Sequence, residues 1–440
     1  MSQALLQAWA KTLRRHGADR AIVEAAGGTA VTFRELDARA EAWLHRHAPD
    51  PARLRGRAVV FGTANGIGWL EVFLGLLKAG AVVVPLDAGE PPAAQRRLAG
   101  TLRAAAWWNG AKLVALSGAK RYRDPAVCFI KLTSGSTGRP RALVFTGGQL
   151  LADARQVTST MGIGPRDLNY ALIPLGHSYG LGNLTIPLLA QGVPLVCGCS
   201  PLPHAIAADF ARWSPTVFPG VPAMWRALAA TDLTLPGLRL AISAGAPLPP
   251  EVARDFAARL GRCVHSFYGS SETGGISYDR TGAGALAGHV GRALRGVKLS
   301  ARPGQRLQVS SAAVLTHGNR HPGRWILPDR VQLAANGVVT LLGRRGTTVK
   351  IAGRRVNLAE VSDRLRRLPD VRDVWVGASP GAEPVLGAVV ATGRSTAELR
   401  TALLADTAPW KIPKKLLVTA ALPLTARGKT DIRALQAMLF

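Results

Sequence analysis

Negative charge is scarce in this sequence, whose 440 residues include 27 Asp and Glu against 55 Lys and Arg. The net charge of +28 excludes an acidic protein and favours polyanionic partners, such as nucleic acid, anionic membranes or acidic proteins. Runs of five or more basic residues and nucleic-acid-binding motifs are absent. We therefore expect most of this charge to be solvated rather than to mark a specific nucleic-acid site.

Long apolar runs are also lacking, since none reaches the ~18 residues that a membrane-spanning helix needs. Lys11, Arg14 and Arg15 follow the first apolar residues near the N-terminus, whereas a secretion signal carries its charges before its apolar segment. We expect a cytoplasmic protein on these grounds. The few cysteines lack the paired spacing of a zinc site and are expected to be free thiols: Cys128, Cys197, Cys199 and Cys263.

The content of 48% hydrophobic and 19% charged residues suits a globular protein with more than one domain. Apolar strands such as Ala58–Phe61 alternate with helical patterns such as Gly68–Lys78, which predicts parallel α/β layers. After Gly337 and a predicted strand at Val338–Leu342, short strands and amphipathic helices predict a small α+β domain. The strands are expected at Val371–Val376 and Val385–Val390, and the helices at Leu358–Leu368 and Thr396–Leu404.

The segment Leu132–Arg141 is the most informative part of the chain, because hydroxyl residues and glycines follow an apolar run that predicts a buried strand. Glycines let backbone N–H groups turn toward an anion, and hydroxyls add uncharged donors. Arg139 and Arg141 supply positive charge at the end of this segment. Its spacing is not G-x-x-x-x-G-K-[ST], which excludes a P-loop nucleotide site. We predict a phosphate-binding loop, with a solvated turn as the alternative.

The chain resembles the adenylate-forming family, which comprises acyl-CoA synthetases, aryl-acid ligases and the adenylation domains of peptide synthetases. The resemblance runs nearly from end to end as an ordered series of short motifs. Besides the phosphate-binding loop they are Val31–Leu36, Leu77–Asp87, Pro174–Leu181, Ser243–Leu248, Tyr268–Thr273, Gly343–Arg344, Lys350–Val356 and Pro423–Lys429.

This resemblance implies a large N-terminal α/β domain of layered sheets and helices over residues 1–345, followed by a small mobile C-terminal α+β lid over 346–440. Gly346 stands where the family has its hinge, at a position that in relatives is commonly Asp or Lys. The large domain is expected to be shortened between about 88 and 130.

The implied activity joins a carboxylate to the α-phosphate of ATP, forming an acyl-AMP, and then transfers the acyl group to a thiol of coenzyme A or of a phosphopantetheine arm on a carrier protein. A carboxylate is ionised at neutral pH, so the first step needs cations and hydrogen-bond donors rather than a base. The residues implied to bind ATP are Thr133, Ser134, Gly135, Ser136, Thr137, Gly138, Arg141, Ala244, Gly245, Ala246, Tyr268, Thr273, Asp329 and Arg344.

Two charged residues are implied to act directly in the chemistry. Glu272 would help to hold Mg²⁺, a hard cation that prefers oxygen ligands. Lys429 would enter from the lid and bridge the acid and the α-phosphate with its compact ammonium. The alternatives are a turn cap for Glu272, a solvated side chain for Lys429 and, for Asp329, half of a surface ion pair with Arg330.

The implied acid pocket includes His177, Ser178, Phe218, Gly220 and Val221. Relatives that activate α-amino acids carry an Asp where this chain has Ser178, and a serine cannot neutralise an ammonium group. We therefore expect an aryl or fatty acid rather than an α-amino acid. His177 has the alternative of a core imidazole bonded to backbone.

In the thiol-transfer step the lid of relatives rotates and brings the segment containing Lys350, Gly353 and Arg355 against the active site. The basic net charge makes an acidic acyl carrier protein an attractive acceptor beside coenzyme A. Two further departures from the family pattern are Arg141 in place of the usual Lys, and Leu327–Pro328 before Asp329. The alternative function is a catalytically inactive relative that acts as a basic binding protein.

Overall fold

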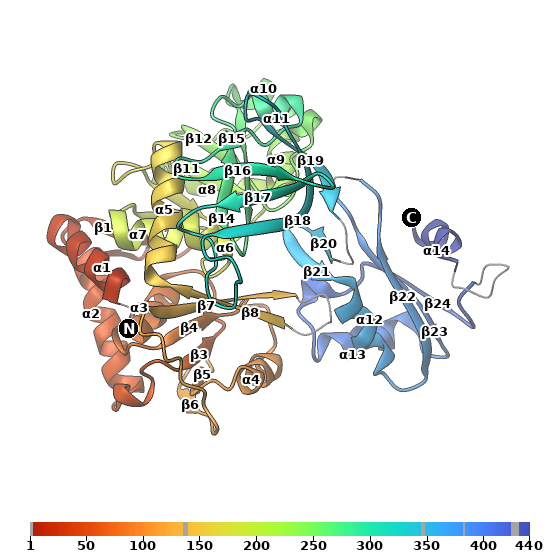
Figure 1. The fold of residues 1–440 in the computed structure, drawn as a ribbon, viewed down its shortest axis with the longest axis horizontal. Helices are drawn as coiled ribbons and strands as arrows, with labels where there is room; N and C mark the ends of the chain where they lie inside the picture. The colour runs from red at the N-terminus through yellow and green to blue at the C-terminus, as the bar shows by residue number, and fades with distance from the viewer. Residues whose placement is uncertain (1–2, 135–139, 345–347, 382, 424–430) are drawn as a thin grey trace.

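A computed structural model describes residues 3–134, 140–344, 348–381, 383–423 and 431–440. The chain forms a large body of layered sheets and helices and a smaller unit at the C-terminus, shown in blue in Figure 1. This arrangement confirms the predicted fold class. No helix among the described residues is long and apolar enough to cross a membrane.

Two mostly parallel sheets make up the interior of the large body. The first has six strands in the order β6 (Leu113–Ala115), β5 (Ala106–Trp108), β3 (Ala58–Phe61), β4 (Val82–Pro85), β7 (Val127–Ser134) and β8 (Pro140–Thr146). The second has nine, in the order β15 (Arg292–Ala293), β14 (Gly274–Tyr278), β13 (Val264–Ser270), β12 (Leu240–Ser243), β11 (Val217–Gly220), β9 (Asn169–Ala171), β10 (Leu195–Cys197), β1 (Arg20–Glu24) and β2 (Ala30–Thr32).

Helices cover these sheets and lie between them. They are α1 (Gln3–His16), α2 (Phe33–His47), α3 (Ile67–Lys78), α4 (Pro92–Thr101), α5 (Gly147–Met161), α6 (Ser178–Gly180), α7 (Ile186–Gln191), α8 (Pro203–Trp213), α9 (Pro222–Ala229), α10 (Pro250–Leu260) and α11 (Ala283–Ala287), with the 3₁₀ turn η1 (Pro51–Arg53) and the π-helical turn η2 (Leu181–Thr185). One apolar cluster joins α1, α2, α3, α5 and α7 to both sheets, so these helices form the layer between them. Most residues of α3 are buried, which explains why its sequence is largely apolar.

The motif Val31–Leu36 contains the residues that cap the start of helix α2. The Thr32 hydroxyl accepts a hydrogen bond from the Glu35 backbone N–H at 3.1 Å, and the Glu35 carboxylate accepts one from the Thr32 N–H at 2.7 Å. This reciprocal capping satisfies donors that a helix start leaves free. The Thr-x-x-Glu spacing at the start of the chain therefore has a structural role.

A four-stranded antiparallel sheet completes the large body: β16 (Lys298–Arg302), β17 (Arg306–Ser310), β18 (Arg324–Leu333) and β19 (Val339–Arg344). Between residues 88 and 130, where we expected a shortening, the chain forms α4, β5 and β6.

The C-terminal unit, here called the lid, contains the hairpin β20 (Thr348–Ile351) and β21 (Arg354–Asn357), then α12 (Leu358–Arg366), β22 (Val371–Ala378), β23 (Leu386–Thr392), α13 (Thr396–Leu404), the 3₁₀ turn η3 (Pro409–Lys411), β24 (Lys415–Thr419) and α14 (Ile432–Leu439). Its three-stranded sheet has β23 in the centre, antiparallel to β22 and parallel to β24. The lid has an apolar core of its own, centred on side chains such as Val356, Leu365 and Val390, as an independent unit requires.

Candidate active site

A cleft of about 240 Å³ lies between the large body and the lid. It contains residues that are far apart in the sequence and that we predicted to share one site. From the large body come Thr133, His177, Ser178, Ala244 and Gly245, and from the lid come Lys350, Gly353 and Arg355. Ala244, Gly245 and Ala246, implied by the family resemblance to lie along the adenine of ATP, are here called the adenine strip. Ala246 is half-buried and is not among the described residues that line the cleft.

The two ends of the predicted phosphate-binding loop belong to the paired strands β7 and β8. Thr133 pairs with Arg141 and Ser134 with Pro140 in their antiparallel ladder, so both ends of the loop are strand rather than coil. The Arg141 guanidinium lies over the Trp325 ring, 5.3 Å from its centroid, which is a cation–π contact on the outside of the hairpin. Among the described residues of this segment, Leu132 and Thr133 line the cleft.

Two residues predicted to bind the nucleotide are hydrogen-bonded to each other. The Tyr268 hydroxyl donates to Asp329 Oδ2 at 2.7 Å. Asp329 also lies opposite Arg344 in the ladder of β18 and β19. Strand β18 continues through Leu327–Pro328, and Asp329 lies beside Arg344 despite this departure from the family pattern.

The turn that follows β13 carries the remaining predicted residues. Thr273 is fully buried, its hydroxyl lies 3.0 Å from that of Ser270, and it donates to the Gly274 carbonyl, so it is used within the turn. Glu272 is half-buried and follows Ser271, which lines the cleft. Its carboxylate is close enough to the buried Lys131 to affect the pKa of that lysine. Glu272 itself is not among the described residues that line the cleft, so its assignment to Mg²⁺ stays a prediction.

The lid hairpin approaches the adenine strip closely through two glycines in the left-handed region. A Cβ on Gly245, at φ +93°, would lie 3.3 Å from the Cα of Gly353. A Cβ on Gly353, at φ +80°, would lie 2.8 Å from Val221 Cγ1. Both the backbone conformation and the space therefore require glycine at these positions. Val221, predicted for the acid pocket, instead contacts the lid.

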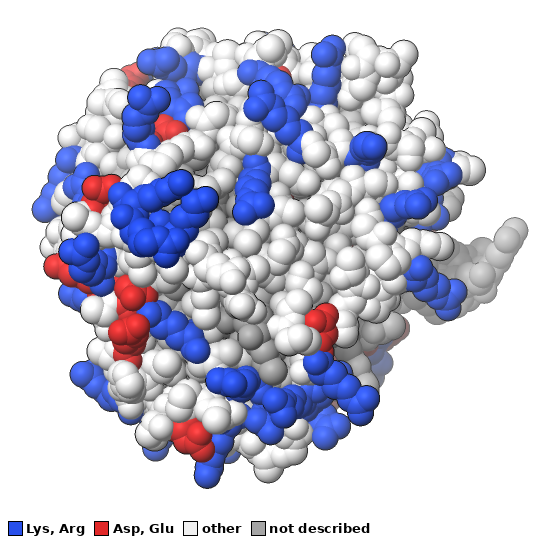
Figure 2. Space-filling model, turned by 60° about the vertical axis from the view of Figure 1, so that its left-hand side comes forward, with Lys and Arg blue, Asp and Glu red and all other residues white. Residues whose placement is uncertain are grey.

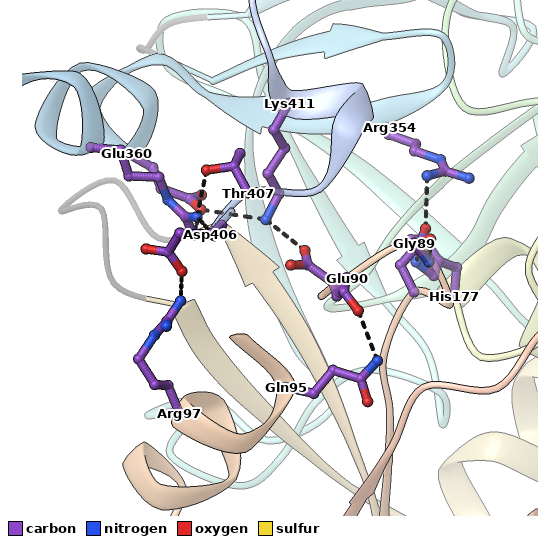
Figure 3. A network of polar contacts seen from close by, with 12 residues as sticks. Gly89, Glu90, Gln95, Arg97, His177, Arg354, Glu360, Asp406, Thr407 and Lys411 are labelled. Atoms are coloured by element: carbon purple, nitrogen blue, oxygen red, sulfur yellow. Dashed lines mark hydrogen bonds and ion pairs between the residues drawn. The ribbon is translucent and has the colours of Figure 1, made fainter. Parts of the chain in front are cut away.

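An aspartate that follows β4 connects the acid pocket to the lid. Asp87 Oδ2 lies 2.8 Å from the Arg354 guanidinium and 3.8 Å from His177 Nε2. Arg354 and His177 are labelled in Figure 3. Burial lowers the pKa of His177, and the nearby Arg354 and Lys411 lower it further, whereas Asp87 acts in the opposite direction. The imidazole is therefore neutral at neutral pH and lies on the cleft wall rather than in the core.

A second ion-pair network joins the two domains. Lys411 Nζ lies 3.0 Å from Glu90 of the large body and 3.3 Å from Glu360 of α12, and all three side chains are at most 15% exposed (Figure 3). Arg97 of α4 and Asp406 of the lid form a further pair that is about half exposed. The lid is thus held in this orientation by charge pairs as well as by the glycine contacts.

Two residues predicted for the acid pocket lie elsewhere. Phe218 is fully buried in a cluster with Tyr170, Phe210 and Trp225, and a Cβ on Gly220 would lie 2.8 Å from Trp225 Cζ2. Both belong to β11, a central strand covered by helices on this face, so the core takes up the space that we assigned to substrate. The structure places neither among the described residues that line the cleft.

Several predicted residues fall outside the described part of the chain. They are Gly135, Ser136, Thr137, Gly138, Gly346 and Lys429. Their assigned roles stay predictions.

Other residues of the cleft were not predicted as site residues. The sequence carries a weak signal for Lys131, which is a single charge inside an apolar strand, and for Asp153, which falls on the buried face of α5. Glu90, Arg354 and Lys411 give no such signal, because their partners are distant in sequence; Glu90 and Lys411 are separated by 321 positions.

Comparisons with known proteins point to the same family as the sequence motifs. Residues 118–302 match the family described as AMP-binding enzyme. A feruloyl-CoA synthase from Amycolatopsis sp is 25% identical over 92% of this chain and 93% of its own length. A benzoate–CoA ligase from Thauera aromatica is 28% identical over 69% of this chain, and the match spans 64% of that ligase, just under two thirds of its length.

Among solved structures, o-succinylbenzoate CoA synthetase (MenE) from Bacillus subtilis, bound with its product analogue, has the same fold. The two chains superpose with a TM-score of 0.84 at 20% identity, covering 98% of each.

Proposed function

We propose that the chain is a member of the adenylate-forming family, which activates a carboxylic acid with ATP and passes the acyl group to a thiol. The observation that carries this proposal is the single cleft in which Thr133 and Gly245 of the large body meet Lys350, Gly353 and Arg355 of the lid. A phosphate-binding hairpin, a nucleotide strip and a thiol-transfer segment in one cavity suit two successive reactions on one acyl group.

In the first reaction an oxygen of the acid attacks the α-phosphorus of ATP. A new P–O bond forms while the bond to pyrophosphate breaks, which leaves acyl-AMP. The barrier is electrostatic because two anions must meet, so donors and cations placed in advance lower it. We assign the donors to Thr133 and the hydroxyls of the loop that follows it, and the bridging cation to Lys429.

Mg²⁺ prefers oxygen ligands, and a carboxylate lies next to a residue that lines the cleft. Glu272 is half-buried beside the cleft-lining Ser271 and would supply one carboxylate, with phosphate oxygens and water as the other ligands. When bound, the ion offsets negative charge on the phosphates. The hydrogen bond between Tyr268 and Asp329 orients the carboxylate that we assign to the ribose.

In the second reaction the thiol sulfur attacks the acyl carbon, the C–S bond forms, the C–O bond to AMP breaks and the thiol proton is released. Gly353 would let the pantetheine arm pass close to the backbone. We infer that the observed lid orientation serves this step, because the hairpin that carries Gly353 lies against Gly245.

An aryl acid is the substrate class that we favour. Ser178 lines the cleft at the position where relatives for α-amino acids carry a carboxylate, and it cannot neutralise an ammonium group. The relatives are named for benzoate and feruloyl groups, which are aromatic. Tyr179 and Phe267 contribute aromatic surface to the cleft.

The acceptor is coenzyme A or the phosphopantetheine arm of an acidic carrier protein. Lys and Arg outnumber Asp and Glu over the face shown in Figure 2, which favours an acidic protein partner. Transfer to a carrier protein should slow steeply as salt concentration rises, whereas transfer to a small thiol should depend weakly on salt. Because the reactions need ATP and a reduced thiol, we place them in the cytoplasm.

The deciding experiment is exchange of labelled pyrophosphate into ATP with a panel of aryl and fatty acids. We expect exchange that depends on both the acid and Mg²⁺, with the reaction lacking acid as the control. Absence of exchange with every acid, together with salt-sensitive retention on DNA, would support the inactive basic binding protein instead.

A further inference from the structure

The inner end of the cleft carries three polar side chains that neither proposed reaction uses. Lys131 comes from β7, Asp153 from α5 and Asn183 from the π-helical turn η2, and all three line the cleft while at most 5% exposed. Apolar side chains line the same cavity, among them Val157, Tyr179 and Phe267. Such a combination of apolar walls and a few placed polar groups is typical of a ligand pocket.

Lys131 is a donor without a hydrogen-bonding partner among the described residues. Its Nζ lies 4.3 Å from the centroid of the Phe145 ring, and no described carboxylate is within ion-pair distance. Burial lowers the pKa of Lys131, while the charges of Asp153 and Glu272 act to raise it. A buried nitrogen in this setting gains free energy from any acceptor that enters the cavity.

Asp153 brings a compensating carboxyl group to the same place. Its Oδ1 accepts a hydrogen bond from the Gly275 N–H at 2.8 Å. A Cβ on Gly182 would lie 2.8 Å from Oδ2, so this glycine leaves room for the carboxylate. When both are ionised, Lys131 and Asp153 carry opposite charges, so together they add no net charge to the cavity.

Asn183 supplies an acceptor that lacks a partner. Its Nδ2 donates to the Tyr179 carbonyl at 3.0 Å, which fixes the orientation of the amide, whereas Oδ1 is buried and has no hydrogen bond. A buried polar atom without a partner has lost its hydrogen bonds to water and gains free energy from a ligand that donates to it. The π-helical turn that carries Asn183 is a rare geometry that is frequent at functional sites.

We propose that the inner end of the cleft binds a hydroxyl group on the acid, accepting from Lys131 and donating to Asn183, so that the protein selects hydroxylated aryl acids. This inference rests on the proposed function and names its substrate class.

Lys131 and Asn183 together favour a hydroxyl over other substituents on the acid. A hydroxyl can accept from an ammonium and donate to an amide oxygen at the same time. A second carboxylate would leave Asn183 Oδ1 without a donor and would add charge to a neutral pair. An aromatic amine donates well but is a poor acceptor, so it would leave Lys131 unsatisfied.

The test compares matched acids in pyrophosphate exchange: unsubstituted, hydroxyl, amino and second-carboxylate versions of benzoic and cinnamic acid, with all ring isomers. For the native protein we expect kcat/KM to be at least ~10-fold higher with one hydroxylated isomer than with its unsubstituted parent, since sites built for a hydroxyl discriminate strongly. Lys131→Met and Asn183→Leu should each reduce this ratio ~10-fold or more. The double variant Lys131→Met/Asp153→Asn removes both members of the pair and guards against misfolding from one unpaired charge.

Lys120→Met is the matched control, because Lys120 is exposed and does not line the cleft. Its hydroxyl preference should equal that of the native protein. Equal kcat/KM for hydroxylated and unsubstituted acids, or variants that lower both alike, would overturn this inference and leave the ligase function intact. No exchange with any acid would instead reject the proposed function.

Discussion

Lys131 and Lys411 line the same cleft, yet their surroundings differ. Lys411 lies 3.0 Å from Glu90 and 3.3 Å from Glu360, so its charge is neutralised by the protein itself. Lys131 has an aromatic ring at 4.3 Å and no ion pair within the described residues. The first arrangement ties one domain to the other, whereas the second leaves donor capacity for a ligand. The comparison teaches that pairing, rather than burial alone, separates a structural lysine from a binding one.

The largest effect should come from a third lysine, Lys429, which we assign to the adenylation step. Lys429→Ala should lower acid-dependent pyrophosphate exchange ~10³-fold, about 4 kcal/mol, because a cation at the reacting phosphate would be lost. Thioester formation from supplied acyl-AMP should continue. The exposed Lys414 of the lid provides the control, as Lys414→Ala should leave exchange unchanged. Full exchange in the Lys429 variant would contradict its role.

A fully paired carboxylate away from the cleft should affect stability instead of chemistry. Asp167 accepts hydrogen bonds from Arg239 at 2.6 Å, from Thr216 at 2.9 Å and from the Gly164 N–H at 3.0 Å. Asp167→Asn should lower the free energy of unfolding by ~2 kcal/mol. This value is smaller than for a fully buried ion pair, because Arg239 is partly exposed and solvent screens its charge. Urea unfolding measures the loss, and Asp50→Asn, in an exposed pair with Arg53, should change stability by less than ~1 kcal/mol.

The same aspartate predicts a pH dependence. Burial acts to raise the pKa of Asp167, but the hydrogen bonds from Arg239, Gly164 and Thr216 outweigh it and hold the pKa below its ordinary value. A carboxyl group with a lowered folded pKa stabilises the protein above its unfolded pKa of ~3.9 and loses that contribution as pH falls through the folded pKa. The difference in unfolding free energy between native protein and Asp167→Asn should therefore be constant near neutral pH and shrink below pH ~4. A difference that grows on acidification would contradict this assignment.

The smallest effect should come from the paired lysine at the domain interface. Lys411→Met leaves Glu90 and Glu360 without their shared cation, which destabilises the observed lid orientation. Thioester formation should fall ~10-fold, or about 1.4 kcal/mol, while pyrophosphate exchange is retained. Single-turnover assays of the two steps separate them.

Arg97→Ala, which removes the half-exposed pair with Asp406 in the same interface, should change thioester formation by less than ~2-fold. If Lys411→Met slowed both reactions equally, the interface pairs would not act through lid orientation.

Local sequence patterns predicted the elements accurately where one pattern dominated. The strand Ala58–Phe61 and the helix Thr396–Leu404 have the predicted bounds. A short apolar run is typical of a buried strand, and an amphipathic period is typical of a helix. The assignment of Leu132–Arg141 to phosphate stays a prediction, and the two ends of this segment pair as strands because β8 returns beside β7. Sequence patterns did not predict the position of Phe218, because an apolar side chain near a motif suits a pocket and a core equally well. In the structure the helices packed on β11 bury it in the core.

By itself, the sequence determined the layered α/β body, the α+β lid and the order of the motifs that mark the family, since these depend on residue types and spacings along the chain. Only the tertiary structure decided which charges meet. Coulomb energy and hydrogen bonding depend on distances between segments, and folding brought Glu90 to Lys411 while leaving Lys131 and Asn183 Oδ1 without hydrogen-bond partners among the described residues at the inner end of the cleft.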